Sequence, residues 1–212
     1  MFGGHYVAWR QSRMNGLDKW LGHDFWKGKT VLEVGCGFAD IGNTLHDRGA
    51  IVSCCDASES HIEHVKEKYP HLNSFVYDMD SPFEQVGTEH CKRYDVVLHF
   101  GVLYHLASTN KHMDDICQYC DWLILETEVN DSDGDYVLIR NEGTLYYDQA
   151  YNGWASRLSA KHVEIALERN GMEYTRYDDS ILNARFHIYD WPEQPVGDWV
   201  PGHRRFWICQ KM

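Results

Sequence analysis

The stretch VLEVGCGFADIG contains a glycine turn of the kind that binds nucleotides. An apolar run precedes Gly35 and Gly37, and a helical pattern follows them. Dinucleotide sites have a third glycine in the pattern G-x-G-x-x-G, so that a pyrophosphate can lie on bare backbone at the helix N-terminus. Here that position is Asp40, whose carboxylate would repel the phosphates. We therefore expect a nucleotide-type site that binds neither NAD nor FAD.

Three carboxylates are expected near this turn. Glu33 precedes the glycines, Asp56 ends the run AIVSCCD, and Asp78 follows the run SFVY. An acid about 20 residues after such glycines typically accepts hydrogen bonds from ribose hydroxyls, which is the role we expect for Asp56. Three carboxylates at the carboxyl ends of neighbouring parallel strands favour a ligand that carries a ribose, an amino group and a net positive charge.

The segment GVLYHL, directly after the run YDVVLHF, offers candidates for proton transfer. It contains Tyr104 and His105, and histidine side chains titrate near neutral pH. Glu126 and Glu128 close a later apolar run, and they share one face if that run is a strand. We expect His105, Tyr104 and Glu126 to be catalytic and Glu128 to contact the substrate. A packing role for His105 and a solvated strand end for the glutamates are the alternatives.

Composition narrows the classes of partner. The chain has 212 residues and a formal net charge of -12, which disfavours nucleic acid, because nucleic-acid binding draws much of its affinity from a basic surface. A neutral or cationic ligand suits this charge better. No apolar run approaches the ~20 residues needed to cross a bilayer, so we expect no membrane partner.

The seven cysteines predict free thiols rather than disulfides. Their number is odd, two are adjacent at 54–55, and no signal peptide is recognisable, so we expect a reducing, cytoplasmic location. Cys117-x-x-Cys120 has no second pair at a zinc-site spacing. The sequence DSDGD at 131–135 lacks the later glutamate of a calcium loop. We expect no metal.

Alternating apolar runs and helical patterns predict an α/β fold with a parallel sheet and crossover helices. The expected helices cover 6–21, 41–48, 59–69, 111–118 and 160–170. Strands are expected in TVLEV, AIVSCCD, SFVYDMD, YDVVLHF and DWLILETE, followed by an antiparallel closing pair in MEYTRYDD and RRFWICQK. Residues 129–159 are Gly-rich and aromatic, with at most a hairpin, and 180–202 form an insertion whose length is typical of functional loops.

The order of these motifs resembles the class I S-adenosylmethionine-dependent methyltransferases. VLEVGCGFA matches the family's first motif, with Ala39 in place of its third glycine, and CCDAS matches the ribose-binding acid motif. YDMD matches the acid that holds the adenine amino group, and YDVVLHFGVLYHL matches the fourth motif. The resemblance covers about 30–130 and implies a Rossmann-like sheet of seven strands in the order 3-2-1-4-5-7-6, the last strand antiparallel, with helices on both faces.

The resemblance also implies a single domain with S-adenosylmethionine as its cofactor. We divide the domain into an N-terminal helical cover (1–28), a cofactor-binding core (29–130) and a part with substrate-side loops, the last helix and the closing strands (131–212). Carried over position by position, the family's cofactor contacts fall on Glu33, Gly35, Gly37, Asp56, Ala57, Asp78, Met79 and Phe100.

The N-terminal segment and two later loops are expected to complete the site. Tyr6, Arg10 and Arg13 share one helical face, and this region often folds over the cofactor in the family. We expect Tyr6 and Arg13 to contact the cofactor, whereas Arg10 contacts the substrate. YNGWASR at 151–157, read as a loop, contributes the substrate contacts Asn152, Trp154 and Arg157. Aromatic residues suited to a ring or sugar face are Tyr146, Tyr147, Tyr151, Trp154, Trp191 and Trp199.

These features predict methyl transfer to an oxygen or nitrogen of a small-molecule acceptor. The first alternative is an RNA- or tRNA-modifying enzyme, since FGVLYHL also resembles a stretch of the tRNA wobble-uridine carboxymethyltransferases, and Arg204–Arg205 is a cluster on which an RNA could dock. The second is a non-catalytic partner protein that binds the cofactor. The oligomeric state and the acceptor do not follow from the sequence.

Overall fold

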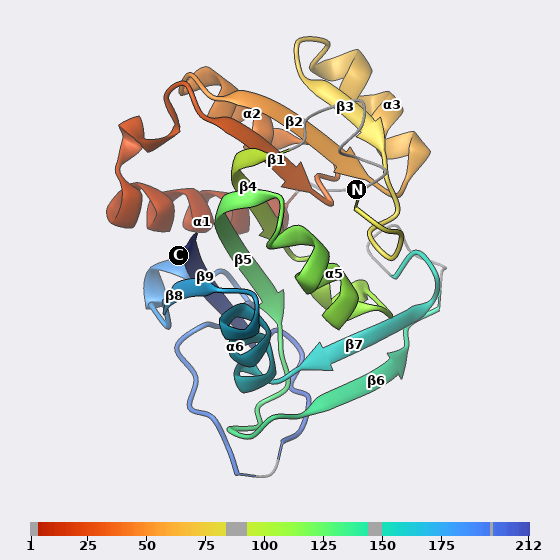
Figure 1. The fold of residues 1–212 in the computed structure, drawn as a ribbon, viewed down its shortest axis with the longest axis vertical. Helices are drawn as coiled ribbons and strands as arrows, with labels where there is room; N and C mark the ends of the chain where they lie inside the picture. Colours follow the sequence, from red (N-terminus) through yellow and green to blue (C-terminus); the bar gives the residue numbers. More distant parts are fainter. Residues whose placement is uncertain (1–3, 84–92, 144–149, 196) are drawn as a thin grey trace.

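A seven-stranded sheet runs through the computed structural model, which describes residues 4–83, 93–143, 150–195 and 197–212 (Figure 1). The strand order is β3-β2-β1-β4-β5-β9-β8. Strands β1 to β5 are parallel, and β9 is antiparallel to both of its neighbours. This confirms the predicted order, with β9 as the antiparallel seventh strand. The strands are β1 Thr30–Val34, β2 Ile51–Asp56, β3 Asn73–Val76, β4 Tyr94–Phe100, β5 Cys120–Glu128, β8 Met172–Arg176 and β9 Arg204–Lys211.

Helices cover both faces of the sheet and create two separate cores. One core contains Leu17 of α1 and Leu45 of α2, and the other contains Met113 of α5 and Val163 of α6. Neighbouring residues along a strand alternate between the two cores, which is why strands buried on both faces read as continuous apolar runs. The helices are α1 His5–Leu21, α2 Asp40–Asp47, α3 Glu59–Lys68, α5 Thr109–Ile116 and α6 Ala160–Arg169, with short 3-10 turns η1 His23–Trp26, η2 Leu103–His105 and η3 Ser180–Leu182.

Capping residues mark where α3 and α6 begin and where α6 ends. The Ser58 hydroxyl accepts a hydrogen bond from the first turn of α3, and the Ser159 hydroxyl does the same for α6. Gly171 follows α6 with a φ of 66°, a left-handed conformation that favours glycine after a helix. In the described chain, no helix is both long enough and apolar enough to cross a membrane.

The predicted loop at 151–157 is wrong, because this segment contains a strand. Strand β7, Trp154–Leu158, pairs in antiparallel fashion with β6, Val137–Asn141, as a separate two-stranded sheet. The hairpin packs on the segment after β4: the Ser156 hydroxyl donates to the Leu106 carbonyl at 3.0 Å. The two polar residues of β7, Ser156 and Arg157, are buried against the rest of the protein.

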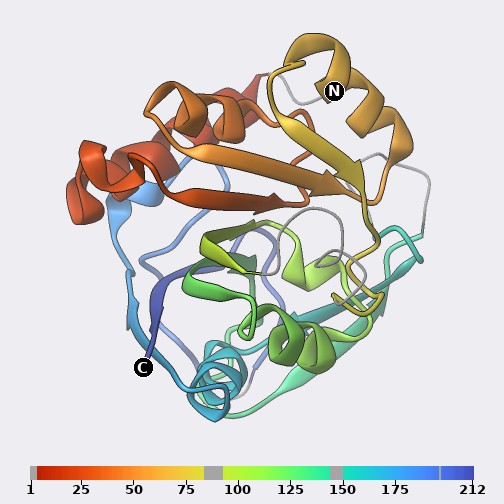
Figure 2. The same cartoon turned by 45° about the horizontal axis from the view of Figure 1, so that its top comes forward.

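The N-terminal helix α1 lies against the insertion that precedes β9. Lys19 pairs with Asp179 at 2.6 Å, and α1 contacts η3 (Figure 2). Further along the insertion, Tyr189 is fully buried, and its hydroxyl accepts a hydrogen bond from the Trp9 indole at 2.8 Å. The insertion is therefore a packed part of the protein that holds α1 in place over the sheet.

Two buried histidines join β4 to α5. The Nε2 atoms of His99 and His112 lie 2.8 Å apart, and His112 Nδ1 donates to the Met79 carbonyl at 2.9 Å. Burial lowers the pKa of both side chains, that of His112 to about 4. Both histidines are therefore neutral at pH 7, which allows one Nε2 to donate to the other.

Acidification is expected to destabilise the protein through this pair. The unfolded chain takes up protons on these histidines near pH 6.5, whereas folded His112 stays neutral down to about pH 4. Because the unfolded state binds more protons in this window, the free energy of unfolding falls as pH drops from about 6.5 to about 4, by on the order of 3 kcal/mol for His112. Denaturant unfolding at several pH values measures this slope.

A substitution tests whether the slope comes from the pair. His112→Asn keeps an amide that can donate to the Met79 carbonyl but removes the titrating ring, so its stability should depend less on pH over this range. His46→Asn changes an exposed histidine and should leave the wild-type slope. Three equal slopes would show that the pair does not control acid stability.

Candidate functional site

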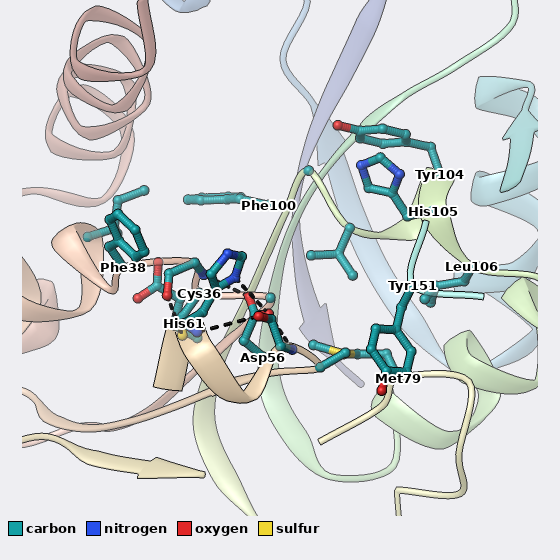
Figure 3. Close-up of a pocket in the computed structure, with 18 of the residues that line it drawn as sticks. Cys36, Phe38, Asp56, His61, Met79, Phe100, Tyr104, His105, Leu106 and Tyr151 are labelled. Atoms are coloured by element: carbon teal, nitrogen blue, oxygen red, sulfur yellow. Dashed lines mark hydrogen bonds and ion pairs between the residues drawn. The ribbon is translucent and has the colours of Figure 1, made fainter. Parts of the chain in front are cut away.

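A cavity of about 400 Å³ opens at the carboxyl ends of β1, β2 and β4 (Figure 3). Asp56 and His61 lie on one side of it, and Tyr104 and His105 on the other. All ten residues expected from the sequence to contact a cofactor line this cavity: Tyr6, Arg13, Glu33, Gly35, Gly37, Asp56, Ala57, Asp78, Met79 and Phe100. The geometry thus brings together positions that are up to 94 residues apart in the chain.

The turn after β1 needs glycine for two reasons. Gly35 has a φ of 62°, and a Cβ there would lie 2.1 Å from Val102 Cγ2. Only glycine avoids both the backbone strain and the clash. Ala39, which replaces the family's third glycine, also has a left-handed conformation, with a φ of 53°.

Asp56 is fixed by hydrogen bonds from the turns around it. Its Oδ2 accepts from the Gly37 amide at 2.9 Å, and its Oδ1 accepts from the Ser58 amide at 2.9 Å. His61 Nδ1 lies 3.1 Å from the same Oδ1. A carboxylate oxygen can accept more than one hydrogen bond, so both oxygens keep capacity for hydroxyl donors in the cavity.

Glu33 is a buried acid that lines the cavity. Its Oε2 accepts from the Gly42 amide at 2.8 Å. Burial raises the pKa of the Glu33 carboxyl to about 8, although the Gly42 amide and the charge of Arg13 oppose the rise. A cation bound beside Glu33 would favour its ionised form.

Two arginines reach the cavity from α1. Arg13 is buried, its Nη1 donates to Glu126 Oε2 at 3.3 Å, and its guanidinium carbon lies 4.0 Å from the centre of the Trp9 ring. Arg10 pairs with Asp40 at 3.0 Å. Lys68 also binds Asp40, at 2.9 Å, so the carboxylate that replaces the dinucleotide glycine is itself held by two cations.

A second cavity of about 500 Å³ adjoins the first. Tyr6, Trp9, Tyr104 and His105 line both cavities. The other residues around the second cavity are Glu128, Arg140, Asn141, Glu142, Arg157, Phe186, His187, Trp199, Pro201, Gly202 and Arg204. His105 and Tyr104, expected to be catalytic, therefore stand at the junction of two spaces that two ligands could occupy.

His105 is held by Glu142, a residue that the sequence analysis did not single out. His105 Nδ1 lies 2.8 Å from Glu142 Oε2. Burial alone would raise the pKa of the Glu142 carboxyl, but hydrogen bonds and charges from His105 and Arg157 outweigh it and lower the pKa to about 2. An ionised carboxylate can only accept hydrogen bonds, so Nδ1 carries a proton towards Glu142, and whenever the ring is neutral its Nε2 is an acceptor. This arrangement is suited to a general base.

Tyr104 is suited to donate a hydrogen bond rather than to accept a proton. Its hydroxyl accepts a hydrogen bond from Arg204 Nη2 at 3.1 Å. Burial raises the pKa of the Tyr104 phenol, although Arg204 opposes the rise. The phenol therefore stays protonated at neutral pH.

Glu126 does not line either cavity. Its side chain is fully buried, with Oε2 3.3 Å from Arg13 and Oε1 2.9 Å from Arg204. Glu128 does line the second cavity and pairs with Arg157 at 3.1 Å. The structure therefore places Glu126, expected to be catalytic, in a buried ion network behind the site.

The other expected substrate contacts are divided between several places. Arg157 lines the second cavity, whereas Arg10 lines the first. Asn152 donates to Asp80 at 3.3 Å, and the Trp154 side chain is 52% exposed. Neither Asn152 nor Trp154 is among the residues around the two cavities.

The aromatic residues of the later loops are also dispersed. Tyr151 lines the first cavity and Trp199 the second. Trp191 is buried in the core, where Arg205 lies 3.6 Å from the centre of its ring. Tyr146 and Tyr147 lie outside the described residues.

Neither metal ligands nor disulfides are found where the structure is described. No group of three or more His, Cys, Asp or Glu side chains there is arranged around a common point for a metal ion. The six described cysteines are all buried and free: Cys36, Cys54, Cys55, Cys117, Cys120 and Cys209. Cys91 is outside the described residues.

Comparison with known proteins identifies the domain type. Residues 32–121 match a family model described as a methyltransferase domain. The ubiquinone biosynthesis O-methyltransferase of Coxiella burnetii is 32% identical over 89 residues, which are 40% of this chain and 36% of that protein. The chain thus matches about a third of the length of this curated relative.

Solved structures share the fold at low sequence identity. The N-terminal domain of EvdMO1, crystallised with SAH and D-fucose, has a TM-score of 0.67 at 15% identity, over 95% of this chain and 82% of that one. Magnesium protoporphyrin IX methyltransferase from Synechocystis PCC 6803, with bound SAH, has a TM-score of 0.63 at 15% identity, over 100% of this chain and 91% of that one. An S-adenosylmethionine-dependent methyltransferase from Mesorhizobium loti has a TM-score of 0.64 at 15% identity and matches over 99% of both chains.

Proposed function

We propose that this chain, which belongs to the class I S-adenosylmethionine-dependent methyltransferases, transfers a methyl group from S-adenosylmethionine to a hydroxyl oxygen of a small molecule. The observation that carries the proposal is the His105–Glu142 pair at the junction of the two cavities. A hydroxyl acceptor must lose a proton when it is methylated, and His105 is placed to take it.

The first cavity fits the cofactor. Its described lining includes five carboxylates and two arginines, an arrangement suited to the sulfonium and amino cations of S-adenosylmethionine. Asp56 would accept the ribose hydroxyls, and Asp78 with Met79 would meet the adenine. Glu33 would lie near the amino group, and Arg13 would bind the cofactor carboxylate, because one buried atom of its guanidinium, Nε, has no partner in the described structure.

Methyl transfer requires the protein to orient the acceptor and to accept its proton, and it requires no covalent intermediate with the protein. When bound, the cofactor supplies a methyl carbon activated by positive sulfur. Tyr104 and the neighbouring aromatic walls would hold the acceptor in line, and such orientation can be worth roughly 7–11 kcal/mol. His105 Nε2 would take the hydroxyl proton as the oxygen–carbon bond forms and the carbon–sulfur bond breaks, leaving S-adenosylhomocysteine. Glu142 would stabilise the imidazolium that results.

Radioactive methyl transfer tests this function. The protein is incubated with methyl-labelled S-adenosylmethionine and a cell extract divided into small-molecule, RNA and protein fractions. Label is expected in the small-molecule fraction. A protein that binds the cofactor but labels no fraction would favour the non-catalytic alternative, and label in RNA alone would favour the RNA-modifying alternative.

The RNA alternative loses one of its two supports, the arginine pair on which an RNA could dock. Arg204 and Arg205 are 2% and 1% exposed. Both guanidinium groups are engaged inside the protein, Arg204 with Glu126 at 2.9 Å and Arg205 with the Trp191 carbonyl at 2.8 Å. They are therefore not available to phosphates at the surface.

Replacing Asp56 by alanine is expected to weaken cofactor binding by roughly 1–3 kcal/mol, because the ribose hydroxyls lose their acceptor. Titration calorimetry with S-adenosylhomocysteine measures the change. Asp47→Ala, an exposed acid at the end of α2, is the control and should bind as the wild type does. Unchanged affinity in Asp56→Ala would remove the cofactor assignment of this cavity.

A further inference from the structure

The two cavities carry opposite balances of charge. Around the first cavity the described residues include five carboxylates against two arginines, Arg10 and Arg13. Around the second they include two carboxylates, Glu128 and Glu142, against Arg140, Arg157 and Arg204. The acidic cavity suits a cationic cofactor, so the second cavity differs from it in the charge that it would attract.

The surplus positive charge of the second cavity belongs to one residue. Arg157 pairs with both Glu128 and Glu142, and Arg204 pairs with Glu128 at 3.5 Å and with a further buried glutamate. No described carboxylate lies within ion-pair distance of Arg140. Its guanidinium carbon instead lies 3.8 Å from the centre of the Trp199 ring, a cation–π contact that orients the group without neutralising it.

Arg140 also lines the same cavity as the proposed base. It lies in β6, and Glu142 follows two residues later, where its backbone amide still bonds across the hairpin to the Gly153 carbonyl at 2.9 Å. Residues i and i+2 of an extended strand share a face and are about 7 Å apart. Glu142 binds His105, and both Arg140 and His105 line the second cavity, so the unneutralised cation and the base border the same space.

We propose that the acceptor is an aromatic hydroxy acid whose ionised carboxylate is bound by Arg140 while its hydroxyl faces His105. This rests on the proposed function and names its substrate class. A planar guanidinium can bind a carboxylate with two parallel hydrogen bonds, and Tyr6, Tyr104 and Phe186 give the cavity aromatic walls for a ring. One surplus positive charge matches one carboxylate better than a phosphate dianion.

This assignment differs from what the net charge suggests. A chain with a formal charge of -12 favours neutral or cationic ligands at long range. Exposed charges more than about 8–10 Å away are largely screened at physiological salt, however. At contact distance the local balance within the second cavity decides which ligand is held.

Binding measurements test the proposal without relying on turnover. The probes are the three isomers of hydroxybenzoate, the three corresponding neutral hydroxybenzamides, and 4-hydroxyphenyl phosphate. Each is titrated against the protein, with and without saturating S-adenosylhomocysteine, by ligand-observed NMR. At least one acid should bind tenfold or more tightly than its amide and more tightly than the phosphate.

Two arginine variants assign the effect to its residue. Arg140→Gln should remove the preference for the acid and leave the affinity for the amide and for S-adenosylhomocysteine unchanged. Arg185→Gln, an exposed arginine outside both cavities, should keep the preference.

The proposal is overturned if every acid binds no better than its amide, if the phosphate binds best, or if the preference survives Arg140→Gln. The separate titration with S-adenosylhomocysteine shows whether the cofactor assignment holds. A failure of the proposed function is therefore distinguishable from a failure of this inference.

Discussion

Replacing His105 by alanine is expected to lower kcat by about 100- to 10,000-fold, the range typical for loss of a general base, while the Kd for S-adenosylhomocysteine changes little. The reason is the position of the side chain: it lines both cavities, and Glu142 holds its Nδ1 at 2.8 Å. Steady-state kinetics with the acceptor found by methyl labelling, together with cofactor titration, measure both quantities.

Two further variants separate catalysis from packing. Glu142→Gln should lower kcat less than the loss of the ring itself, because the ring remains but is no longer oriented by an ionised carboxylate. His162→Ala is the matched control. His162 Nδ1 lies 2.6 Å from Asp135 Oδ1, and neither residue lines either cavity. This substitution should leave kcat unchanged. A His105→Ala protein that binds cofactor weakly but turns over normally at saturation would make His105 a cofactor contact.

Replacing Glu126 by glutamine is expected to lower the free energy of unfolding by about 3–5 kcal/mol. The substitution removes a fully buried carboxylate that lies between Arg13 and Arg204, and removal of one partner from a buried ion pair leaves an uncompensated charge. Denaturant unfolding measures the change.

An exposed ion pair supplies the comparison for Glu126. Asp121 pairs with Arg93 at 2.5 Å, with about half of each side chain exposed, and Asp121→Asn should cost at most about 1 kcal/mol. A Glu126→Gln protein of wild-type stability that has lost turnover would instead restore the catalytic role expected from the sequence. Wild-type stability with wild-type turnover would show that the network contributes little.

The cofactor side of the site was predictable because its residues follow strands directly. Glu33 and Asp56 lie near or at the ends of two neighbouring strands, and the register Glu33↔Cys54 and Val34↔Cys55 sets those ends side by side. Parallel strands meet at a common edge, so chain order alone places these side chains around one cavity. Gly35 was recognisable in the sequence from the G-x-G turn, and the structure shows that only glycine fits at this position.

The acceptor side was not predictable in the same way. His105 and Glu142 are 37 residues apart, and they meet only because the β6–β7 hairpin packs on the segment after β4. No local pattern encodes that packing. The surroundings of Glu142, RNEGT, carry ordinary turn signals, and they lie in a Gly-rich, aromatic segment that was expected to contain at most a hairpin.

The buried ion pairs of Glu126 could not be foreseen from the sequence. Glu126 and Glu128 were expected together at the substrate, on the correct assumption that alternate strand residues share a face. Arg13 and Arg204, from the two ends of the chain, bind Glu126 before any ligand could. Ion pairs between distant segments depend on tertiary packing, which residue spacing does not reveal.

The separate two-stranded sheet has a consequence for how such a protein can change over evolutionary time. Strands β6 and β7 pair only with each other, so the seven-stranded sheet with its cofactor residues does not depend on backbone pairing with them, although Arg157 of β7 binds Glu128 of β5. The hairpin nevertheless carries Arg140, and the residue after β6 is Glu142. Mutations in the β6–β7 hairpin can therefore change which acceptor is bound, while the residues that bind the cofactor stay the same.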